Sequence, residues 1–407
     1  MNILMVSDVY FPRVNGVSTS IQTYRRDLIA LGHRCLLLAP RYPAGPATED
    51  PDVVRVGSRR VPRDPEDRLP SRRALLAQSD WLGRQRIDVV HVQTPFVAHY
   101  AGVELARRLG VPVVESYHTY FEHYLHHYVP LLPRRLLQSI ARRLTVSQCR
   151  QVDAVISPSG QMAEALRAYG VATPIEVLPT GLPPTCFVAG QGARFRLRHG
   201  IAAQRPLALF VGRVAHEKNI DFLLHMLARL RRLVPEVLLV IAGEGPALAH
   251  TRQLVEHLEL GQHVLFVGYM DRHSELLDCY RAADVFVFAS RTETQGLVLL
   301  EAMAQGTPVV STAVMGTVDV LAGAGGAVVV PEDREAFACA VADLLHDPAR
   351  REQLRERASE DAARWSSRRM AERLLRLYER VRQGRRVTKD SRRGHAADTD
   401  DTHTRVA

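Results

Sequence analysis

The segment from Val285 to Ser311 reads as strand, helix and strand in close succession. Apolar Val285–Ala289 is typical of a buried strand, a helix is expected to open at Gly296, and Pro308–Ser311 supplies the next strand. Two strands joined by a helix favour a parallel pair, in which the helix begins at the carboxyl ends of the strands. The segment therefore predicts an α/β sheet with a ligand-binding edge.

The same alternation of strand and helix runs through the rest of the chain in two series. In the first series, strands are expected at Ile3–Val6, Cys35–Ala39, Val53–Val56, Val89–Val92, Val113–Glu115, Ala154–Ser157 and Ile175–Leu178. Helices are expected between them at Val17–Leu31, Arg72–Gln85, Val97–Leu109 and Ser159–Tyr169. The second series has strands at Leu207–Gly212, Val237–Ala242, Val264–Val267, Val285–Ala289, Val309–Ser311 and Ala327–Val330, followed by helices at Glu332–His346, Pro348–Ala363 and Ser367–Arg382. The turn-rich stretch 181–192 separates the series, so two doubly wound α/β domains are predicted for these 407 residues.

Charge and cysteine content limit the partners and the cellular compartment that are expected for this chain. The chain carries a formal net charge of +9 and has 22 arginines against 16 acidic residues over residues 1–183, which suits either nucleic acid or an anionic membrane surface. No apolar run reaches the roughly 20 residues that a membrane span needs. Met1 and Asn2 lead directly into a strand, so no secretion signal is expected. The five scattered cysteines fit a reducing cytoplasm.

Two carboxylates flank the expected helix start, Glu293 before it and Glu301 within it. Free N–H groups and the positive end of the helix dipole make the start at Gly296 an anion site. The carboxylates suit hydroxyl groups on either side of that anion, which is the polarity pattern of a sugar nucleotide. An alternative is that Glu293 only complements the dipole and Glu301 is solvated. The residues around Glu301 in the sequence are apolar, which disfavours a solvated position for its side chain.

This segment resembles the signature of the retaining glycosyltransferases of the GT-B fold that carry a Glu-x7-Glu motif, and the resemblance extends from Met1 to about Arg382. It implies that the first Glu binds sugar hydroxyls and the second binds the ribose. The Glu-Thr-Gln-Gly-Leu variant, with Gln295 where many members have Phe, is familiar among members acting on diacylglycerol or related lipids. The donor-binding residues implied within the motif are Glu293, Thr294, Gln295, Gly296, Leu297 and Glu301.

The resemblance also implies two Rossmann-like domains facing across a cleft. We expect an acceptor-binding domain at residues 1–183, joined by a helix at 367–383 that crosses back onto it. A nucleotide-sugar-binding domain is expected at residues 184–366. The segment 384–407 is polar, has no core-forming residues and is expected to be disordered.

Arg213 and Lys218 lie in the first strand-to-helix loop of the second series. Two cations beside the helix start would offset the charges of a diphosphate and of the two glutamates, and would stabilise the leaving diphosphate. A solvated loop is the alternative, and the resemblance assigns both residues to the diphosphate. With these cations no metal and no other cofactor is expected. The patterns Asp50-Pro-Asp52 and Asp398-Thr-Asp400 do not follow strands as a metal-binding pair should.

In the first series, His118 follows a strand, where a hydrogen-bonded structural histidine is the usual finding. The resemblance assigns it to the donor sugar near the reacting carbon, so His118 joins Glu293, Arg213 and Lys218 as the predicted catalytic residues. Gly16 opens a helix and is expected to let backbone approach the donor, and Asp8 is assigned to the acceptor. His123, His126 and His127 fit either a metal-binding helix face or, more simply, surface histidines.

The segment Leu131–Leu144 is basic and amphipathic. Leu132, Leu136, Leu137, Ile140 and Leu144 recur at helical spacing, and the flanking arginines are Arg134, Arg135, Arg142 and Arg143. A helix of this kind can lie in a membrane interface. Alternatively its leucines pack on the sheet. The matching region of lipid-acting family members is a membrane-docking helix, so these arginines are assigned to acceptor or membrane contact.

These features together predict a metal-independent, retaining hexosyltransferase at the cytoplasmic face of the cell membrane. Its partners would be a nucleotide sugar (UDP-glucose, UDP-galactose or GDP-mannose), a lipid such as diacylglycerol or a glycolipid, and an anionic membrane surface. Within the same class, a soluble or polyprenyl-linked glycan acceptor is the alternative. A nucleotide-sugar epimerase ranks below both. Nucleic acid ranks last, because no basic stretch interleaved with aromatic residues is present.

Overall fold

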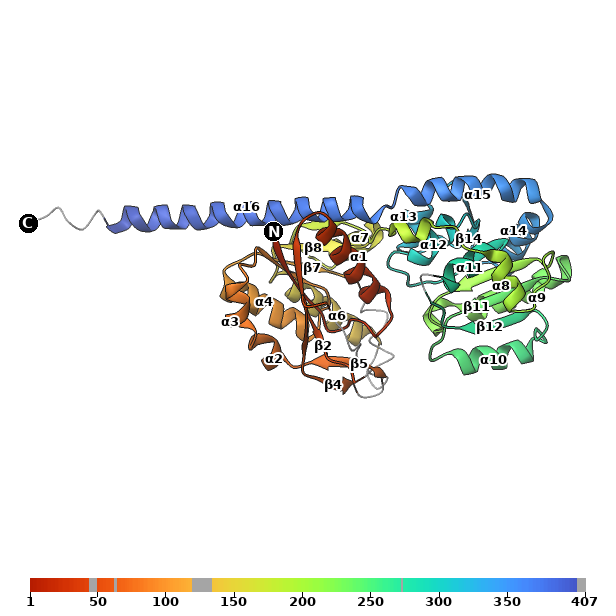
Figure 1. Ribbon diagram of the computed structural model, residues 1–407, viewed down its shortest axis with the longest axis horizontal. Coiled ribbons are helices and arrows are strands. Elements are labelled where there is room, and N and C mark those ends of the chain that lie inside the picture. The colour runs from red at the N-terminus through yellow and green to blue at the C-terminus, as the bar shows by residue number, and fades with distance from the viewer. Residues whose placement is uncertain (44–49, 62–63, 119–133, 272–273, 401–407) are drawn as a thin grey trace, which may run out of the picture. The chain divides into compact units, whose positions relative to one another are not determined.

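The computed structural model describes residues 1–43, 50–61, 64–118, 134–271 and 274–400 (Figure 1). Side chains at 64–67, 134–135 and 386–400 are outside the description. The chain separates into two compact units. Unit 1 comprises Met1–Pro158, Ala163–Pro179 and Arg368–Ala407, and unit 2 comprises Ser159–Met162 and Thr180–Ser367.

Unit 1 is built on a parallel sheet of seven strands in the order β3-β2-β1-β6-β7-β8-β9. The strands are β1 (Asn2–Val6), β2 (Arg34–Pro40), β3 (Val53–Val56), β6 (Val89–Val92), β7 (Val113–Ser116), β8 (Ala154–Ser157) and β9 (Ile175–Val177). The inner strands are buried on both faces. Apolar runs without alternation are what a parallel sheet covered on both faces requires, so the sequence predicted these strands.

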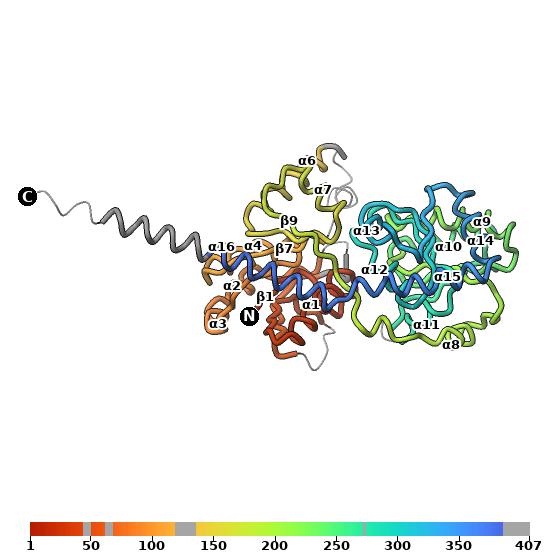
Figure 2. Tube along the Cα trace, turned by 90° about the horizontal axis from the view of Figure 1, so that it is seen from above, coloured from red at the N-terminus to blue at the C-terminus, as the bar shows by residue number. Residues whose placement is uncertain are grey.

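Helices cover both faces of this sheet. One face packs against α1 (Gly16–Ala30) and α16 (Ser367–Asp400), which share a hydrophobic cluster with alternate residues of the strands (Figures 1 and 2). The other face packs against α4 (Val97–Leu109), where a Cβ on Gly102 would lie 2.6 Å from Val92 Cγ2. Two further helices of the first series are α6 (Arg134–Cys149) and α7 (Gly160–Ala168).

The region between β3 and β6 differs from the prediction. An antiparallel hairpin of β4 (Ser58–Val61) and β5 (Asp64–Pro70) was not expected. The single helix expected at Arg72–Gln85 is two short helices, α2 (Arg72–Leu76) and α3 (Ser79–Arg84). A two-stranded ribbon can satisfy its backbone hydrogen bonds locally, so its charged sequence need not show the apolar pattern of a core strand.

Unit 2 holds a second parallel sheet, in the order β12-β11-β10-β13-β14-β15. Its strands are β10 (Leu207–Val211), β11 (Leu238–Ala242), β12 (Val264–Gly268), β13 (Val285–Phe288), β14 (Val309–Ser311) and β15 (Ala327–Val329). One continuous core surrounds the sheet. The prediction of two Rossmann-like α/β domains with parallel sheets is therefore confirmed.

The helices of unit 2 connect successive strands and close the domain. They are α8 (Gly192–Arg198), α9 (Ile220–Leu233), α10 (Leu248–His257), α11 (Glu275–Ala282), α12 (Leu297–Ala304), α13 (Thr317–Leu321), α14 (Arg334–His346) and α15 (Pro348–Ala363), with 3-10 turns at η1 (Pro184–Phe187) and η2 (His216–Lys218). No helix in the described ranges is both long and apolar enough to cross a membrane.

The last helix is longer than the sequence predicts. It was expected to end at Arg382, with disorder from Gly384, but α16 continues through Asp400. The expectation was wrong for 384–400 because it rested on the lack of core-forming residues. A helix that is already nucleated propagates through polar residues without a core when proline is absent. The end of the tail, 401–407, lies outside the described residues.

Candidate active site

The loop between β13 and α12 is the centre of the candidate site in unit 2. Gly296 precedes α12 with φ 89°, a left-handed conformation, and a Cβ there would lie 2.8 Å from Leu299 Cδ1. Both facts require glycine. The backbone of α12 therefore starts directly at the carboxyl edge of the sheet, where the sequence placed it. Leu297, the first residue of the helix, is half-buried.

Glu293 and Lys218 form an ion pair between Oε2 and Nζ. Glu293 follows β13 and Lys218 follows β10, which are neighbouring strands, so their loops meet at one edge. Both side chains are 18% exposed, and Lys218 Nζ also lies 5.9 Å from the centre of the Phe288 ring. The structure thus brings together two of the predicted catalytic residues.

Glu301 is buried, with 4% of its surface exposed. The hydroxyl of Tyr280, on α11, donates to its Oε2 at 2.9 Å. The alternative that Glu301 is a solvated helix residue is therefore wrong. A buried carboxylate needs hydrogen-bond donors, and Tyr280 is one that the sequence analysis missed because no motif links α11 to α12.

Two further contacts fix the 293–295 loop. The amide of Gln295 is paired with the backbone of Thr180, accepting from its N–H at 2.8 Å and donating to its carbonyl at 2.6 Å. Gly316 N–H donates to the Glu293 carbonyl at 2.8 Å, and a Cβ on Gly316 would lie 2.0 Å from the carbonyl oxygen of Thr294. The side chain of Gln295 thus anchors the loop to the start of unit 2, and Gly316 is a structural requirement that the sequence analysis missed.

Arg213 lies in the loop after β10 and is exposed. Within the part of the chain that the structure describes, no carboxylate pairs with it. Gly243 and Gly245 let the loop after β11 approach the 212–214 backbone, because a Cβ on them would lie 2.0 Å from the Gly212 carbonyl oxygen and 2.4 Å from that of Val214. Next to Arg213, the backbone of the loop after β11 therefore packs directly on the backbone of residues 212–214.

In unit 1, the carboxyl edge of the sheet holds His118 and Gly16. His118 follows β7, and desolvation lowers its pKa to about 4, so the imidazole is neutral at neutral pH. Gly16 begins α1, and no atom lies within 4 Å of the position of a Cβ there. Asn15 caps α1 by accepting from Ser18 N–H at 2.8 Å.

Asp8 serves the start of α4. Its carboxylate accepts from Thr94 Oγ1 at 2.7 Å and from the N–H groups of Phe96 and Ala98 at 3.2 and 2.9 Å. Burial raises its pKa to about 6 even though these hydrogen bonds lower it. The structure thus engages both oxygens of Asp8, which the sequence assigned to the acceptor, in capping a helix.

Helix α6 has two kinds of apolar side chain. Leu136, Ile140 and Leu144 are 48%, 45% and 48% exposed, whereas Leu137 is 3% exposed and packs inward. Arg143 is exposed, and the guanidinium of Arg142 lies 5.1 Å from the centre of the Tyr169 ring. The side chains of Arg134 and Arg135, Leu132 and the three histidines at 123, 126 and 127 lie outside the described residues.

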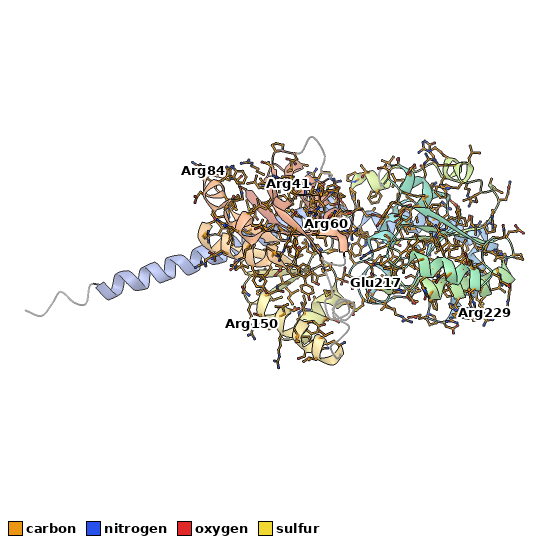
Figure 3. The ribbon with its side chains drawn as sticks, turned by 90° about the horizontal axis from the view of Figure 1, so that it is seen from below. Arg41, Arg60, Arg84, Arg150, Glu217 and Arg229 are labelled. Atoms are coloured by element: carbon orange, nitrogen blue, oxygen red, sulfur yellow. The ribbon has the colours of Figure 1, made fainter. Side chains whose placement is uncertain are left out.

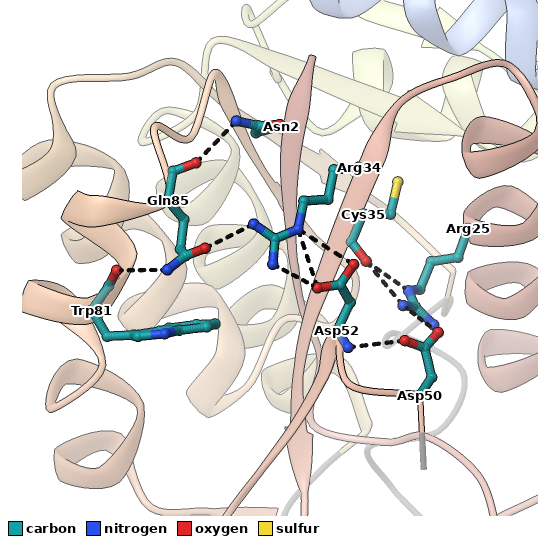
Figure 4. Close-up of polar contacts among 8 residues, drawn as sticks. All are labelled: Asn2, Arg25, Arg34, Cys35, Asp50, Asp52, Trp81 and Gln85. Atoms are coloured by element: carbon teal, nitrogen blue, oxygen red, sulfur yellow. Dashed lines mark hydrogen bonds and ion pairs between the residues drawn. The ribbon is translucent and has the colours of Figure 1, made fainter.

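Both aspartates of the Asp50-Pro-Asp52 pattern form ion pairs with arginines (Figure 4). Asp50 Oδ2 lies 3.0 Å from Arg25 Nη2, and Asp52 Oδ1 lies 2.8 Å from Arg34 Nη2. Gln85 Oε1 accepts from Arg34 Nη1 at 2.7 Å. The two aspartates therefore hold separate cationic side chains.

Exposed arginines come from many elements of both units. Figure 3 labels Arg41, Arg60, Arg84 and Arg150 on unit 1 and Arg229 on unit 2. Each belongs to a different helix, strand or loop. The positive charge of the chain is thus spread over its surface.

Comparison with known proteins agrees with this arrangement. Residues 14–185 match the model of Glycosyltransferase Family 4, and residues 193–361 match that of Glycosyl transferases group 1. The alpha-monoglucosyldiacylglycerol synthase of Streptococcus pneumoniae is 33% identical over 323 residues, which cover 76% of this chain and 71% of the relative.

The chain belongs to the group 1 glycosyltransferases of the GT-B fold.

A second relative, the GDP-mannose-dependent alpha-mannosyltransferase of Mycobacterium tuberculosis, is 30% identical over 95% of this chain and 98% of its own length. Among solved structures, sucrose-phosphate synthase from Thermosynechococcus elongatus has a TM-score of 0.75 and 23% identity, covering 93% of this chain and 98% of the other. This glycosyltransferase therefore shares its fold along nearly the whole chain.

Proposed function

We propose that this glycosyltransferase transfers a hexose, with retention of configuration, from a nucleotide sugar to a membrane lipid such as diacylglycerol or a glycolipid. The donor would be UDP-glucose, UDP-galactose or GDP-mannose. Unit 2 would bind the donor and unit 1 the acceptor. The observation that carries the proposal is the pair of Lys218 and Glu293 at the carboxyl edge of the second sheet, beside the glycine-started helix α12.

The donor's charge pattern fits this edge. A nucleotide sugar brings about two negative charges on its diphosphate, and these need cations in a site that already holds Glu293 and Glu301. Lys218, the exposed Arg213 and the N-terminus of α12 would supply positive charge to the diphosphate. Glu293 would then bind hydroxyls of the sugar, and Glu301, oriented by Tyr280, would bind the ribose.

The same cations would act in the chemical step. As the bond from the sugar to the diphosphate breaks, negative charge grows on the leaving oxygen, and Lys218 and Arg213 would stabilise it without a metal ion. His118, which desolvation keeps neutral, would contact the transferring sugar as a hydrogen-bonding group. The acceptor hydroxyl would attack the sugar carbon from the face on which the diphosphate leaves and give its proton to the donor's own phosphate, so the configuration would be retained.

A lipid acceptor is supported by the named activity of the Streptococcus pneumoniae relative and by α6. The exposed residues Leu136, Ile140 and Leu144 are four apart and form one apolar stripe, with Arg143 exposed next to Leu144. An apolar stripe flanked by arginines suits the interface of an anionic membrane. We therefore place the enzyme at the inner face of the cell membrane, bound peripherally through α6.

The test offers three radiolabelled donors, UDP-glucose, UDP-galactose and GDP-mannose, to the full chain with anionic vesicles that contain diacylglycerol. Label is expected in a lipid-extractable product for one donor, with or without EDTA. Glu293→Gln should abolish it, whereas Glu335→Gln, an exposed glutamate with 66% of its side chain accessible, should not. Label found only in water-soluble products would contradict the lipid acceptor and favour a soluble glycan. Full activity of Glu293→Gln would contradict the site.

A further inference from the structure

Gln93 lies at the same sheet edge as His118 and has no role in the proposed function so far. It follows β6, and its backbone N–H donates to the Val6 carbonyl of the neighbouring β1 at 2.9 Å. His118 follows β7, the neighbour of β6 on its other side. Gln93 is 1% exposed, so its amide is buried in the edge that holds His118.

The two ends of this amide differ. Oε1 lies 3.4 Å from His118 Nε2, whereas Nε2 is buried and has no hydrogen-bond partner among the described residues. By contrast, the amide nitrogens of Gln148 and Gln295 donate to the carbonyls of Pro95 and Thr180. A buried amide N–H without a partner is rare and costly. Exchanging the two ends by rotation would leave the other atom unpartnered instead.

The contact with Gln93 also decides which nitrogen of His118 carries the proton. A neutral imidazole has one donor and one acceptor nitrogen. Because the oxygen of Gln93 can only accept, Nε2 of His118 is the donor and Nδ1 is the acceptor. The edge therefore offers one acceptor, His118 Nδ1, and one donor, Gln93 Nε2. A hydroxyl group both donates and accepts, so it fits this pair.

We propose that Gln93 fixes the tautomer and orientation of His118 through its amide oxygen and donates its amide N–H to a hydroxyl of the transferred hexose. This inference rests on the proposed function. Gln93 would then be a substrate-binding residue that discriminates between hexoses. A site built to hydrogen-bond a hydroxyl rejects an analogue without it far more strongly than a purely apolar site does.

The first test measures kcat and KM of the full chain with the accepted nucleotide sugar and its 2-, 3-, 4- and 6-deoxy analogues. In the wild type, one analogue should lose at least about 100-fold in kcat/KM. Gln93→Met, which keeps the length of the side chain, should lower kcat/KM for the normal donor about 10- to 100-fold. It should also abolish most of the penalty for that one analogue. Equal penalties in both proteins for every analogue would overturn the inference.

Gln93→Glu is the second variant, and it reports on His118 without changing the size of residue 93. A carboxylate beside Nε2 would raise the pKa of His118, so kcat/KM should gain a dependence on pH between about 5 and 7 in addition to any that the wild type shows. The other ionisable groups at this edge, His91 on β6, Asp8 after β1 and Glu115 on β7, are the same in both proteins. Gln85→Glu, beside Arg34 on the surface, is the matched control and should keep the wild-type profile.

The two proposals fail in different ways. A wild type that transfers no sugar from any nucleotide donor overturns the proposed function and this inference with it. An active wild type whose Gln93→Glu variant keeps an unchanged pH profile overturns the inference alone.

Discussion

Lys218 and Glu293 follow two neighbouring strands and contact each other. The main effect of this contact is to hold the two side chains in place. An ion pair whose side chains are only 18% exposed adds little net stability, because the cost of removing both charges from water offsets much of their attraction. It does hold an ammonium and a carboxylate at the mouth of α12. In the proposed function, an arriving diphosphate would compete for Lys218, and Glu293 would become available to neutral hydroxyls. The site then needs a second cation, and Arg213 is the exposed candidate.

Arg213→Ala is therefore expected to weaken binding of the nucleotide-sugar donor. A hydrogen bond to a charged group is worth about 1.5–3 kcal/mol, which corresponds to roughly 10- to 100-fold in Kd. Isothermal titration calorimetry with the donor or its nucleoside diphosphate measures this. Arg229→Ala removes another exposed arginine, on α9, and should leave Kd unchanged. Identical Kd values for Arg213→Ala and the wild type would remove Arg213 from the site.

The buried Asp8 predicts how the stability of unit 1 depends on pH. Its carboxyl has a pKa of about 6 in the folded state against an ordinary 3.8, so the folded state binds the proton more tightly. The stabilisation from this group is fully present below about pH 4 and is lost as the pH rises through about 6. A shift of about two pKa units corresponds to roughly 3 kcal/mol in the free energy of unfolding.

Urea unfolding followed by Trp81 fluorescence, in a Trp365→Phe background, isolates unit 1, because these are the two tryptophans of the chain. The parent should lose stability between about pH 4 and pH 6 relative to Asp8→Asn, which cannot titrate. Asp80→Asn, at an exposed position on α3, should follow the parent. Parallel curves for the parent and Asp8→Asn would contradict the role given to burial.

Single residues of the site could be predicted from sequence only where a motif carries them. Glu293, Gly296 and Glu301 stand at fixed spacing in one strand-helix unit, so their placement follows from local structure. Tyr280 and Gly316 could not be found in this way. Each serves the site from another element, through a hydroxyl and through the absence of a Cβ respectively. Such contacts depend on tertiary packing, which no local pattern encodes.

At the scale of elements, strands were predicted well because a parallel sheet buries both faces. β3, β6, β8 and β14 have the bounds expected from their apolar runs. The hairpin of β4 and β5 was missed because it has a charged sequence and pairs with itself. Helix ends were less predictable. α16 runs past Arg382, and no proline interrupts its sequence up to Asp400.

On helix α6, the proposed membrane contact can be tested separately from packing, because some of its leucines are exposed and another is buried. Replacing Leu136, Ile140 and Leu144 together by Ser should lower binding to anionic vesicles at least about 10-fold. In the wild type, each of these apolar side chains would move from water into the membrane interface on binding, and serine would gain little from that transfer. Vesicle co-sedimentation measures this. Stability should change little, since these side chains already contact solvent.

Two controls make the α6 prediction specific. Leu197→Ser, at an exposed leucine of α8 that is 84% accessible, should leave vesicle binding unchanged. Leu137→Ala, on the buried side of α6, should instead cost about 2–5 kcal/mol of stability. Unaltered vesicle binding by the triple Ser variant would mean that another surface contacts the membrane.

At the scale of the whole molecule, the chain leaves unit 1 at Pro179 and returns to it at Arg368. The returning helix is part of the core. Ala371, Leu374 and Tyr378 on α16 are fully buried against the sheet of unit 1. The Tyr378 hydroxyl lies 2.7 Å from Nδ1 of the buried His91, whose other nitrogen lies 2.8 Å from Ser116 Oγ. Unit 1 is therefore complete only when the last helix has been made.

Two truncations test this dependence. Ending the chain after Arg386 keeps every described side-chain contact of α16, the last being that of Arg385 with Asp153, so thermal unfolding and sugar transfer should match the full chain. Ending it after Ser367 exposes one face of the unit 1 sheet and should leave unit 1 unfolded. Tyr378→Phe removes one hydroxyl from a buried network and should cost about 1–3 kcal/mol. Circular dichroism and limited proteolysis measure all three. Native resistance to protease in unit 1 of the shorter truncation would show that its sheet does not need α16.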